Sequence, residues 1–156
     1  MNMKRRVFLK GTLASSAVAV AVGAGLLSPR QVLAAWPKAA FEAKNVNEAM
    51  TGIFDTDLAP ASDAIKVEAP DIAENGAVVP VTIQTSLPNV ESISIMAEKN
   101  QTPLIASFNM TPRTGNYVST RIKMGQTSNV IAVVKADGKV YSARKEVKVT
   151  IGGCGG

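Results

Sequence analysis

Hydrophobic and polar residues alternate with a period of two over much of the chain after residue 64, which predicts β-strands. In residues 92–97, for example, Ile93, Ile95 and Ala97 alternate with two serines and a methionine. Short runs of this kind are separated by Pro, Gly, Asn and Asp, which favour turns. The predicted strands are Ile65–Ala69, Val78–Thr85, Val90–Glu98, Leu104–Asn109, Tyr117–Lys123, Val130–Lys135 and Lys139–Ile151.

The segment before these strands has a helical pattern. Between Ala39 and Phe54, the apolar residues Phe41, Ala49, Met50 and Ile53 fall on one face of a helix, and Gly52 stands near the expected end. One helix followed by six or seven short strands indicates an all-β, immunoglobulin-like antiparallel β-sandwich with a short N-terminal helix. The sequence lacks the cysteine pair of antibody domains.

Two turns and the last strand are predicted in more detail. Asp137-Gly138 between two apolar runs is typical of a two-residue β-hairpin, and Asn75-Gly76 is most simply a turn. In the last strand, Lys145, Val147, Val149 and Ile151 share the face expected to pack on the core. The alternate residues, Arg144, Glu146, Lys148 and Thr150, are expected to face water or a partner.

The N-terminus has the three parts of an export signal. A basic stretch, Lys4–Lys10 with the pair Arg5-Arg6, precedes a run of apolar and small residues, and Val32-Leu33-Ala34 offers a signal-peptidase site. The R-R-x-F-L-K arrangement is typical of bacterial twin-arginine signals. A membrane anchor would need about 20 strongly apolar residues, whereas this run is rich in Ala, Gly, Ser and Thr.

Cleavage after Ala34 is favoured, with cleavage after Ala35 as the alternative. The predicted divisions are therefore a signal peptide (1–34), a β-sandwich domain (35–151) and a C-terminal arm (152–156) of a periplasmic protein. Trp36 directly follows the cleavage point and is a candidate anchor for the new N-terminus or a partner contact.

Removal of the signal changes the charge of the protein. The full chain has 17 Lys and Arg against 12 Asp and Glu, a net charge of +5. Five of the basic residues and none of the acidic ones lie in the predicted signal, so the remainder is neutral. Nucleic-acid binding and attachment to an anionic membrane are not expected, because both need a basic patch on the folded domain.

The sequence ends in Gly152-Gly153-Cys154-Gly155-Gly156, which places the only cysteine in a glycine-rich tail. Glycine is conformationally permissive, so we expect a flexible arm with an exposed thiol. The chain contains no histidine to activate that thiol. Activation must then come from a partner that accepts the arm. A carrier thiol, a disulfide to a partner or to a second copy, and an incidental tail remain alternatives.

The sequence gives no sign of a metal or cofactor site, because cysteine and histidine ligands are not clustered. The four methionines Met50, Met96, Met110 and Met124 are expected in the core and not at a copper site. Arg121 and Lys123 alternate on one predicted strand, where a solvated face is more plausible than guidance of an anionic adduct. Because twin-arginine export moves folded cargo, a partner subunit without its own signal is expected to travel with this chain.

The tail sequence Val147–Gly156 resembles that of the sulfur-carrier subunit Y of the bacterial Sox thiosulfate-oxidation system. Three internal segments resemble the same family: Ala69–Val81, Glu98-Lys99-Asn100 with Pro103, and Thr120–Lys123. The resemblance implies an immunoglobulin-like fold, a heterodimer with a smaller β-rich Z subunit, and Cys154 as the attachment residue. It also implies that Gly152, Gly153, Gly155 and Gly156 form the swinging arm.

The resemblance further implies the enzymes that act on the carrier. These are a c-type cytochrome pair that couples thiosulfate to the cysteine, a manganese hydrolase that releases sulfate, and a molybdenum–haem sulfane dehydrogenase or another sulfur-handling route for the sulfur left behind. Their cofactors lie on the partners, so none is expected on this chain, which is predicted not to be an enzyme.

Three other functions compete with this interpretation. Ubiquitin-like carriers also end in Gly-Gly, but they work in the cytoplasm and carry sulfur as a terminal thiocarboxylate, which would leave Cys154 without a role. An exported structural or adhesive β-sandwich could crosslink to a neighbour through Cys154. An autonomous enzyme would need a base or a metal that the sequence does not offer.

Overall fold

The computed structural model describes residues 37–150, which belong to one compact unit. The predicted signal peptide (1–34), Trp36, Ile151 and the Gly152–Gly156 arm lie outside the described residues. The predicted divisions at residues 34 and 151 therefore remain predictions.

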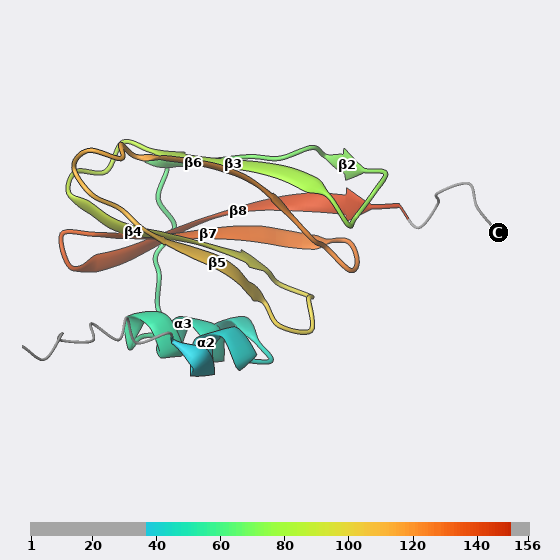
Figure 1. Cartoon of the computed structure of the whole chain (residues 1–156), viewed down its shortest axis with the longest axis horizontal. Coiled ribbons are helices and arrows are strands. Elements are labelled where there is room, and N and C mark those ends of the chain that lie inside the picture. The colour runs from blue at the N-terminus through green and yellow to red at the C-terminus, as the bar shows by residue number, and fades with distance from the viewer. Residues whose placement is uncertain (1–36, 151–156) are drawn as a thin grey trace, which may run out of the picture. The chain divides into compact units, whose positions relative to one another are not determined.

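The described residues form two β-sheets packed face to face (Figure 1). The smaller sheet has the strand order β1–β3–β6, and the larger has the order β2–β8–β7–β4–β5. Neighbouring strands are antiparallel except for β2 and β8, which are parallel. The strands are β1 (Ile65–Glu68), β2 (Ile72–Ala73), β3 (Val79–Thr85), β4 (Val90–Ala97), β5 (Leu104–Asn109), β6 (Tyr117–Ile122), β7 (Ser128–Ala136) and β8 (Lys139–Val149).

Alternation within the strands builds the core between the sheets. In β3, for example, Val79, Val81 and Ile83 are buried, whereas Pro80 and Gln84, which point to the opposite face, are exposed. The same face of β4 and β7 contributes apolar side chains, so that the two sheets enclose one hydrophobic cluster. Each fully buried Val or Ile side chain contributes about 1.5–3 kcal/mol. The immunoglobulin-like β-sandwich predicted from the sequence is confirmed.

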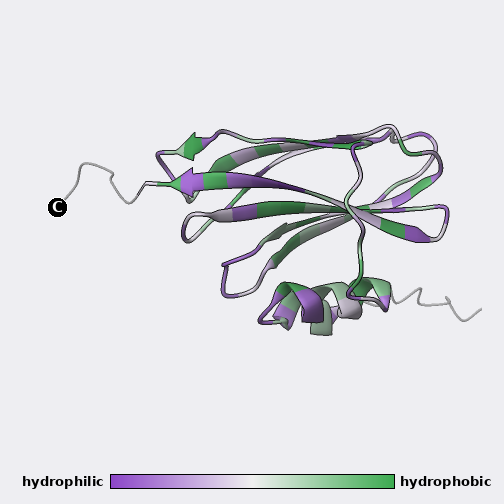
Figure 2. Ribbon diagram, turned by 180° about the vertical axis from the view of Figure 1, so that it is seen from behind, coloured by the Kyte–Doolittle hydropathy of each residue, from purple (hydrophilic) through white to green (hydrophobic). Residues whose placement is uncertain are grey.

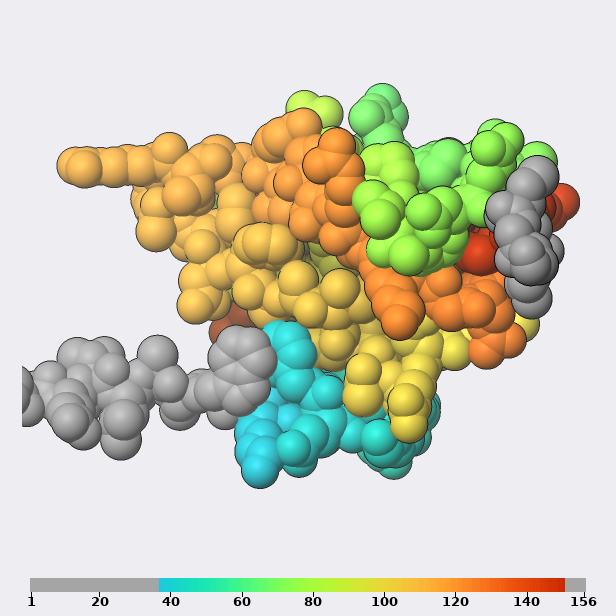
Figure 3. Space-filling model, turned by 45° about the vertical axis from the view of Figure 1, so that its right-hand side comes forward, coloured from blue at the N-terminus to red at the C-terminus, as the bar shows by residue number. Residues whose placement is uncertain are grey.

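A second apolar cluster lies on the outer face of the larger sheet. Two helices, α2 (Lys38–Glu42) and α3 (Val46–Phe54), cover this face (Figures 1 and 2), and the space-filling view shows them directly against the sandwich (Figure 3). Met50 of α3 is buried in one cluster with Met96 of β4 and Ile131 of β7. The central strands β4 and β7 are therefore buried on both faces, which the predicted alternation of residues 92–97 did not indicate.

The prediction of one helix from Ala39 to Phe54 is wrong, because the chain leaves the helical conformation at Ala43. The side chain of Asn45 accepts a hydrogen bond from the backbone N–H of Glu48 (2.9 Å), and the Glu48 carboxylate accepts one from Lys44 N–H (3.1 Å). These two bonds satisfy backbone donors at the start of α3, as in a capping box. Asn45 is thus the cap of a new helix and not an interior residue.

Gly52 is needed for close packing between the helices. A Cβ atom at Gly52 would lie 2.9 Å from the Cα and Cβ atoms of Ala40 in α2, closer than van der Waals contact allows. The residue that ends α3 is Asp55, which has a left-handed conformation (φ 56°).

Several smaller predictions are confirmed. Asp137 and Gly138 both have positive φ (49° and 70°) and join β7 to β8 in a tight hairpin. At Asn75-Gly76 a turn is closed by Val78 N–H and Asn75 C=O (3.2 Å). Met50, Met96 and Met124 are buried, and Met110 packs against the core between the sheets. The two-residue strand β2 was not predicted, because so short a run carries no period.

Candidate functional site

Cys154 and the four glycines around it lie outside the described residues. The structure does describe the end of β8, from which the chain continues toward them. We call residues 147–150 the arm root. In Figure 1 the arm root lies at the end of the sandwich where β8 points toward the C-terminus. Its contacts determine how firmly the predicted arm is attached to the sandwich.

Strand β2 holds one edge of the arm root. It pairs in parallel with β8, with Ile72 opposite Lys148 and Ala73 opposite Val149. Lys148 N–H donates a hydrogen bond to the carbonyl oxygen of Asp71 (2.9 Å), and Thr150 N–H donates one to Ala73 C=O (3.1 Å). Backbone pairing therefore continues through Thr150, the last described residue.

The other edge of the arm root contacts the start of β7 and the residue before it. Ser128 of β7 is paired with Val147 of β8. One position further out, Val149 N–H donates a hydrogen bond to the Thr127 hydroxyl oxygen (2.9 Å). That hydroxyl also lies 3.4 Å from Val149 C=O, to which it donates in turn. A single side chain thus extends the pairing of β8 beyond the end of β7.

Close backbone packing at Gly76 joins the turn after β2 to the loop before β7. Met124 N–H donates a hydrogen bond to Gly76 C=O (2.7 Å). A Cβ atom at Gly76 would lie 2.4 Å from Met124 C=O and 2.7 Å from Cγ1 of Val149. Any side chain there would displace the arm root or the loop. The sequence identified this glycine only as part of a turn.

The two faces of β8 near the arm root differ as predicted. Val147 is fully buried and Val149 is half-buried, whereas Glu146 and Lys148 are exposed. Lys145 lies at the rim of the core and forms an ion pair with Asp71 (3.1 Å). This pair links β8 to the segment that leads into β2.

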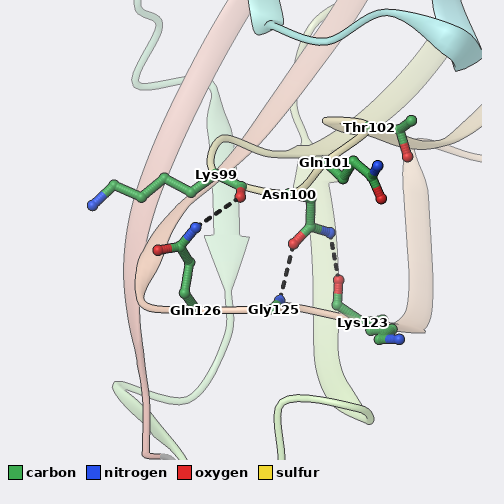
Figure 4. A pocket seen from close by; sticks show the side chains of 7 residues that line it. All are labelled: Lys99, Asn100, Gln101, Thr102, Lys123, Gly125 and Gln126. Carbon is green, nitrogen blue, oxygen red and sulfur yellow. Dashed lines mark hydrogen bonds between the residues drawn. The ribbon is translucent and has the colours of Figure 1, made fainter.

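A polar pocket of about 330 Å³ lies at the same end of the sandwich. Two loops line it, the one between β4 and β5 and the one between β6 and β7 (Figure 4). Thr127, which binds the arm root, directly follows the second lining segment. The lining residues are Lys99, Asn100, Gln101, Thr102, Lys123, Gly125 and Gln126.

Side-chain amides hold the two loops together. The Asn100 side chain donates to Lys123 C=O (2.8 Å) and accepts from Gly125 N–H (3.0 Å). Gln126 Nε2 donates to Lys99 C=O (3.1 Å). These bonds are drawn as dashed lines in Figure 4. Because both loops are tied to each other, the pocket is formed before any ligand binds.

Three segments singled out in the sequence meet at this end of the fold. Ala69–Val81 supplies β2 and Gly76 beside the arm root. Glu98-Lys99-Asn100 and Thr120–Lys123 contribute to the two loops of the pocket. Arg121 itself is exposed on β6, opposite Pro80 of β3, so it does not share the pocket with Lys123.

At this site the described residues supply hydrogen bonds and positively charged side chains. The part of the chain that the structure describes contains no group of three or more His, Cys, Asp or Glu side chains arranged to hold a metal. Two carboxylates outside the pocket have a lowered pKa. A hydrogen bond from Lys66 lowers the pKa of the exposed Glu68, and a hydrogen bond from Lys135 lowers the pKa of the exposed Glu91. A lowered pKa makes both carboxylates weaker bases.

Fold and arm root together define an immunoglobulin-like β-sandwich whose last strand is paired along both edges near its end, and two comparisons connect this class to sulfur oxidation. The family model described as "Sulfur oxidation protein SoxY" matches residues 50–154. The solved structure of the sulfur carrier protein SoxY from Chlorobium limicola f thiosulfatophilum is 46% identical, with a TM-score of 0.60. The match covers 69% of this chain and 97% of that one. The chain belongs to the SoxY family.

Other comparisons add less. A superoxide reductase (neelaredoxin) from Ignicoccus hospitalis is 19% identical, with a TM-score of 0.50, over 56% of this chain and 80% of that one. That likeness concerns the fold alone. No curated protein matches the sequence. Among residues 37–150, no helix has the length and hydrophobicity needed to span a membrane.

Proposed function

We propose that this protein is a periplasmic sulfur carrier that holds intermediates of thiosulfate oxidation covalently on Cys154 and presents them to the enzymes of the Sox system. The observation that carries the proposal is the family match, which extends through Cys154 itself. The related SoxY from Chlorobium is described as a sulfur carrier protein. Cys154 is also the only cysteine of the chain, so it is the only thiol able to bear such an adduct.

The proposed chemistry assigns the carrier one covalent bond and its partners the catalysis. In the loading step, the thiol and thiosulfate lose one proton and two electrons in total and form an S-thiosulfonate, Cys–S–S–SO₃⁻. A c-type cytochrome enzyme accepts the electrons. Water then cleaves the terminal S–S bond at a manganese hydrolase, releasing sulfate and leaving a persulfide. A sulfane dehydrogenase, which accepts the electrons of sulfane oxidation, or another sulfur-handling route then acts on the outer sulfur of the persulfide.

The composition of the chain supports a passive carrier. The sequence contains no histidine to serve as a base for the thiol. The partner enzymes must therefore supply the activation, which keeps the thiol unreactive in transit. Residues 152, 153, 155 and 156 are glycines, which suit a chain that must enter narrow active sites.

The N-terminal sequence and the family support a further proposal, on export and assembly. We propose that residues 1–34 direct the folded protein through the twin-arginine route, together with a Z subunit as a heterodimer. Because that route transports folded proteins, a subunit without a signal can be exported only after it has bound this chain.

Mass spectrometry of the C-terminal peptide from cells supplied with thiosulfate tests the carrier function. A carrier gains a mass matching thiosulfonate or sulfane sulfur on Cys154, and a thiol reductant removes it. The Cys154→Ser variant should carry no adduct and should not support thiosulfate oxidation. The same measurement detects the main alternative, a crosslinking module, which would give disulfide-linked species without added sulfur. Normal oxidation by Cys154→Ser would refute the carrier function.

A further inference from the structure

The polar pocket beside the arm root has an unusual set of charges for a neutral domain. Its lining includes Lys99 and Lys123 and no carboxylate. Elsewhere in the described residues, Lys38, Lys66, Lys135 and Lys145 each form an ion pair with a carboxylate. Within residues 37–150, neither pocket lysine has a carboxylate oxygen within 4.0 Å. The pocket is therefore a local positive site on a domain of no net charge.

The composition of the lining suits an anion with several oxygen atoms. Figure 4 shows the side chains of Lys99 and Lys123 on opposite sides of the Asn100 carboxamide, which ties the loops together. They extend away from each other, so both must turn inward to contact one anion. Gln101 and Thr102, which also line the pocket, add side-chain donors. A tetrahedral oxoanion can accept hydrogen bonds from both sides at once, whereas a carboxylate presents two oxygens in one plane. Flexible lysine side chains suit recognition of such a charge.

The location of the pocket relates it to the proposed carrier function, on which this inference rests. Gln126 lines the pocket, and the next residue, Thr127, binds Val149 of the arm root. Cys154 is four residues beyond Thr150, a distance of at most about 14 Å along an extended chain. The arm root is thus hydrogen-bonded to the residue next to the pocket lining.

We propose that this pocket binds the sulfonate end of a sulfur oxoanion, with Lys99 and Lys123 as the charged ligands and Asn100 as the residue that positions both loops. Free thiosulfate and the thiosulfonate carried by Cys154 share the same –SO₃⁻ group, so the chemistry admits both sources. Binding neutralises the adduct at rest and keeps it at the arm end of the domain.

Nuclear magnetic resonance of the exported chain tests the site directly. The Cys154→Ser variant is titrated with sodium thiosulfate and sodium sulfate at constant ionic strength, with chloride as the reference anion. The amide signals of residues 99–102 and 125–126 should shift on titration. In Lys99→Ala/Lys123→Ala, the apparent affinity should fall about tenfold, since the two charged contacts together contribute of the order of 1–2 kcal/mol. The matched control, Lys44→Ala/Lys139→Ala, removes two charges outside the pocket and should change the affinity less than about twofold.

A second sample distinguishes the source of the anion. Treating the wild-type protein with tetrathionate converts the Cys154 thiol into Cys–S–S–SO₃⁻ and releases thiosulfate and a proton. If the adduct occupies the pocket, the same amides shift without added anion, and the Lys99→Ala/Lys123→Ala variant loses the shift. Shifts with the free anion alone would assign the pocket to free thiosulfate.

Two outcomes overturn the proposed pocket. They are the absence of shifts at these amides in both samples, and equal loss of affinity in the control variant. Either result leaves the carrier function standing if cells still load Cys154. Conversely, binding at the pocket with no adduct on Cys154 in cells would refute the carrier function alone.

Discussion

Gly76 shows how much a single position contributes to the candidate site. The dipeptide Asn75-Gly76 indicates a turn, and the structure confirms it, with Ala77 N–H donating to the Asn75 side chain (2.9 Å). The need for glycine has another cause. Met124 C=O and Val149 occupy the space where a side chain would be. These residues are distant in sequence, so no local pattern could have revealed the contact.

Replacing Gly76 by alanine should destabilise the domain by about 1–3 kcal/mol, because the added methyl group overlaps backbone at the arm root. Urea unfolding measures this loss of free energy. Gly125→Ala is the matched control. A Cβ there would meet only the Asn100 side-chain oxygen, at 3.8 Å, so its stability should stay within about 0.5 kcal/mol of wild type. Equal stability of the two variants would contradict the packing argument.

At the scale of elements, periodicity predicted seven of the strands and missed one that matters to the site. The apolar alternation of β3 and the Asp137-Gly138 hairpin are local properties that the sequence shows directly. Strand β2 has two residues and forms only because the end of β8 lies beside it. The interruption at Asn45 is different, because Asn45 and Glu48 have the local spacing of a capping box, which the prediction of a single helix overlooked. A tertiary contact thus determines β2, whereas a local pattern determines the start of α3.

The β7–β8 hairpin provides a prediction of pH dependence. Glu91 Oε1 accepts a hydrogen bond from Gly138 N–H (2.7 Å), and its Oε2 lies 3.0 Å from Lys135 Nζ. The bond from Lys135, followed by the one from Gly138, lowers the pKa of Glu91 below its usual 4.5. A carboxyl with a lowered pKa in the folded state stabilises the fold above its unfolded pKa. The contribution is lost as the pH falls through the folded pKa.

Glu91→Gln should therefore have a lower Tm than wild type at pH 7, with the difference shrinking as the pH falls below about 4.5 toward 2. Thermal unfolding followed by circular dichroism at a series of pH values measures this convergence. Glu42→Gln serves as control, since its carboxylate makes only an exposed contact with Lys38 at 3.6 Å. A Tm difference that does not change with pH would show that the Glu91 contacts are not ionic.

For the whole molecule, the proposed removal of residues 1–34 changes the net charge. The full chain has a net charge of +5 and a pI near 9.5, and the excess charge lies in residues 1–34. We expect the exported protein to focus near neutrality. The Arg5→Lys/Arg6→Lys variant keeps every charge but removes the twin-arginine pair, so it should accumulate uncleaved in the cytoplasm at the alkaline pI. Isoelectric focusing of the two cell fractions measures this. Export of that variant at the wild-type level would exclude the twin-arginine route.

The candidate site was only partly predictable from the sequence. The thiol and its glycines are adjacent in the chain, so a local motif is enough to identify them. The pocket combines Lys99 and Lys123, which come from different loops, and the arm root depends on Asp71, Ala73 and Thr127. Only folding brings these segments together. The sequence thus predicted the residue proposed to carry sulfur but not the surroundings in which the domain presents it.

The parallel pairing of β2 with β8 has a mechanical consequence. Because β8 is hydrogen-bonded along both edges near its end, a pull on the C-terminal tail loads these bonds in shear, all together, and does not unzip them one after another. Strands loaded in this way resist extension. A partner that draws the tail into a deep channel therefore cannot lengthen it by peeling β8 from the sheet. The depth to which the thiol can penetrate is then set by the residues between Thr150 and Cys154.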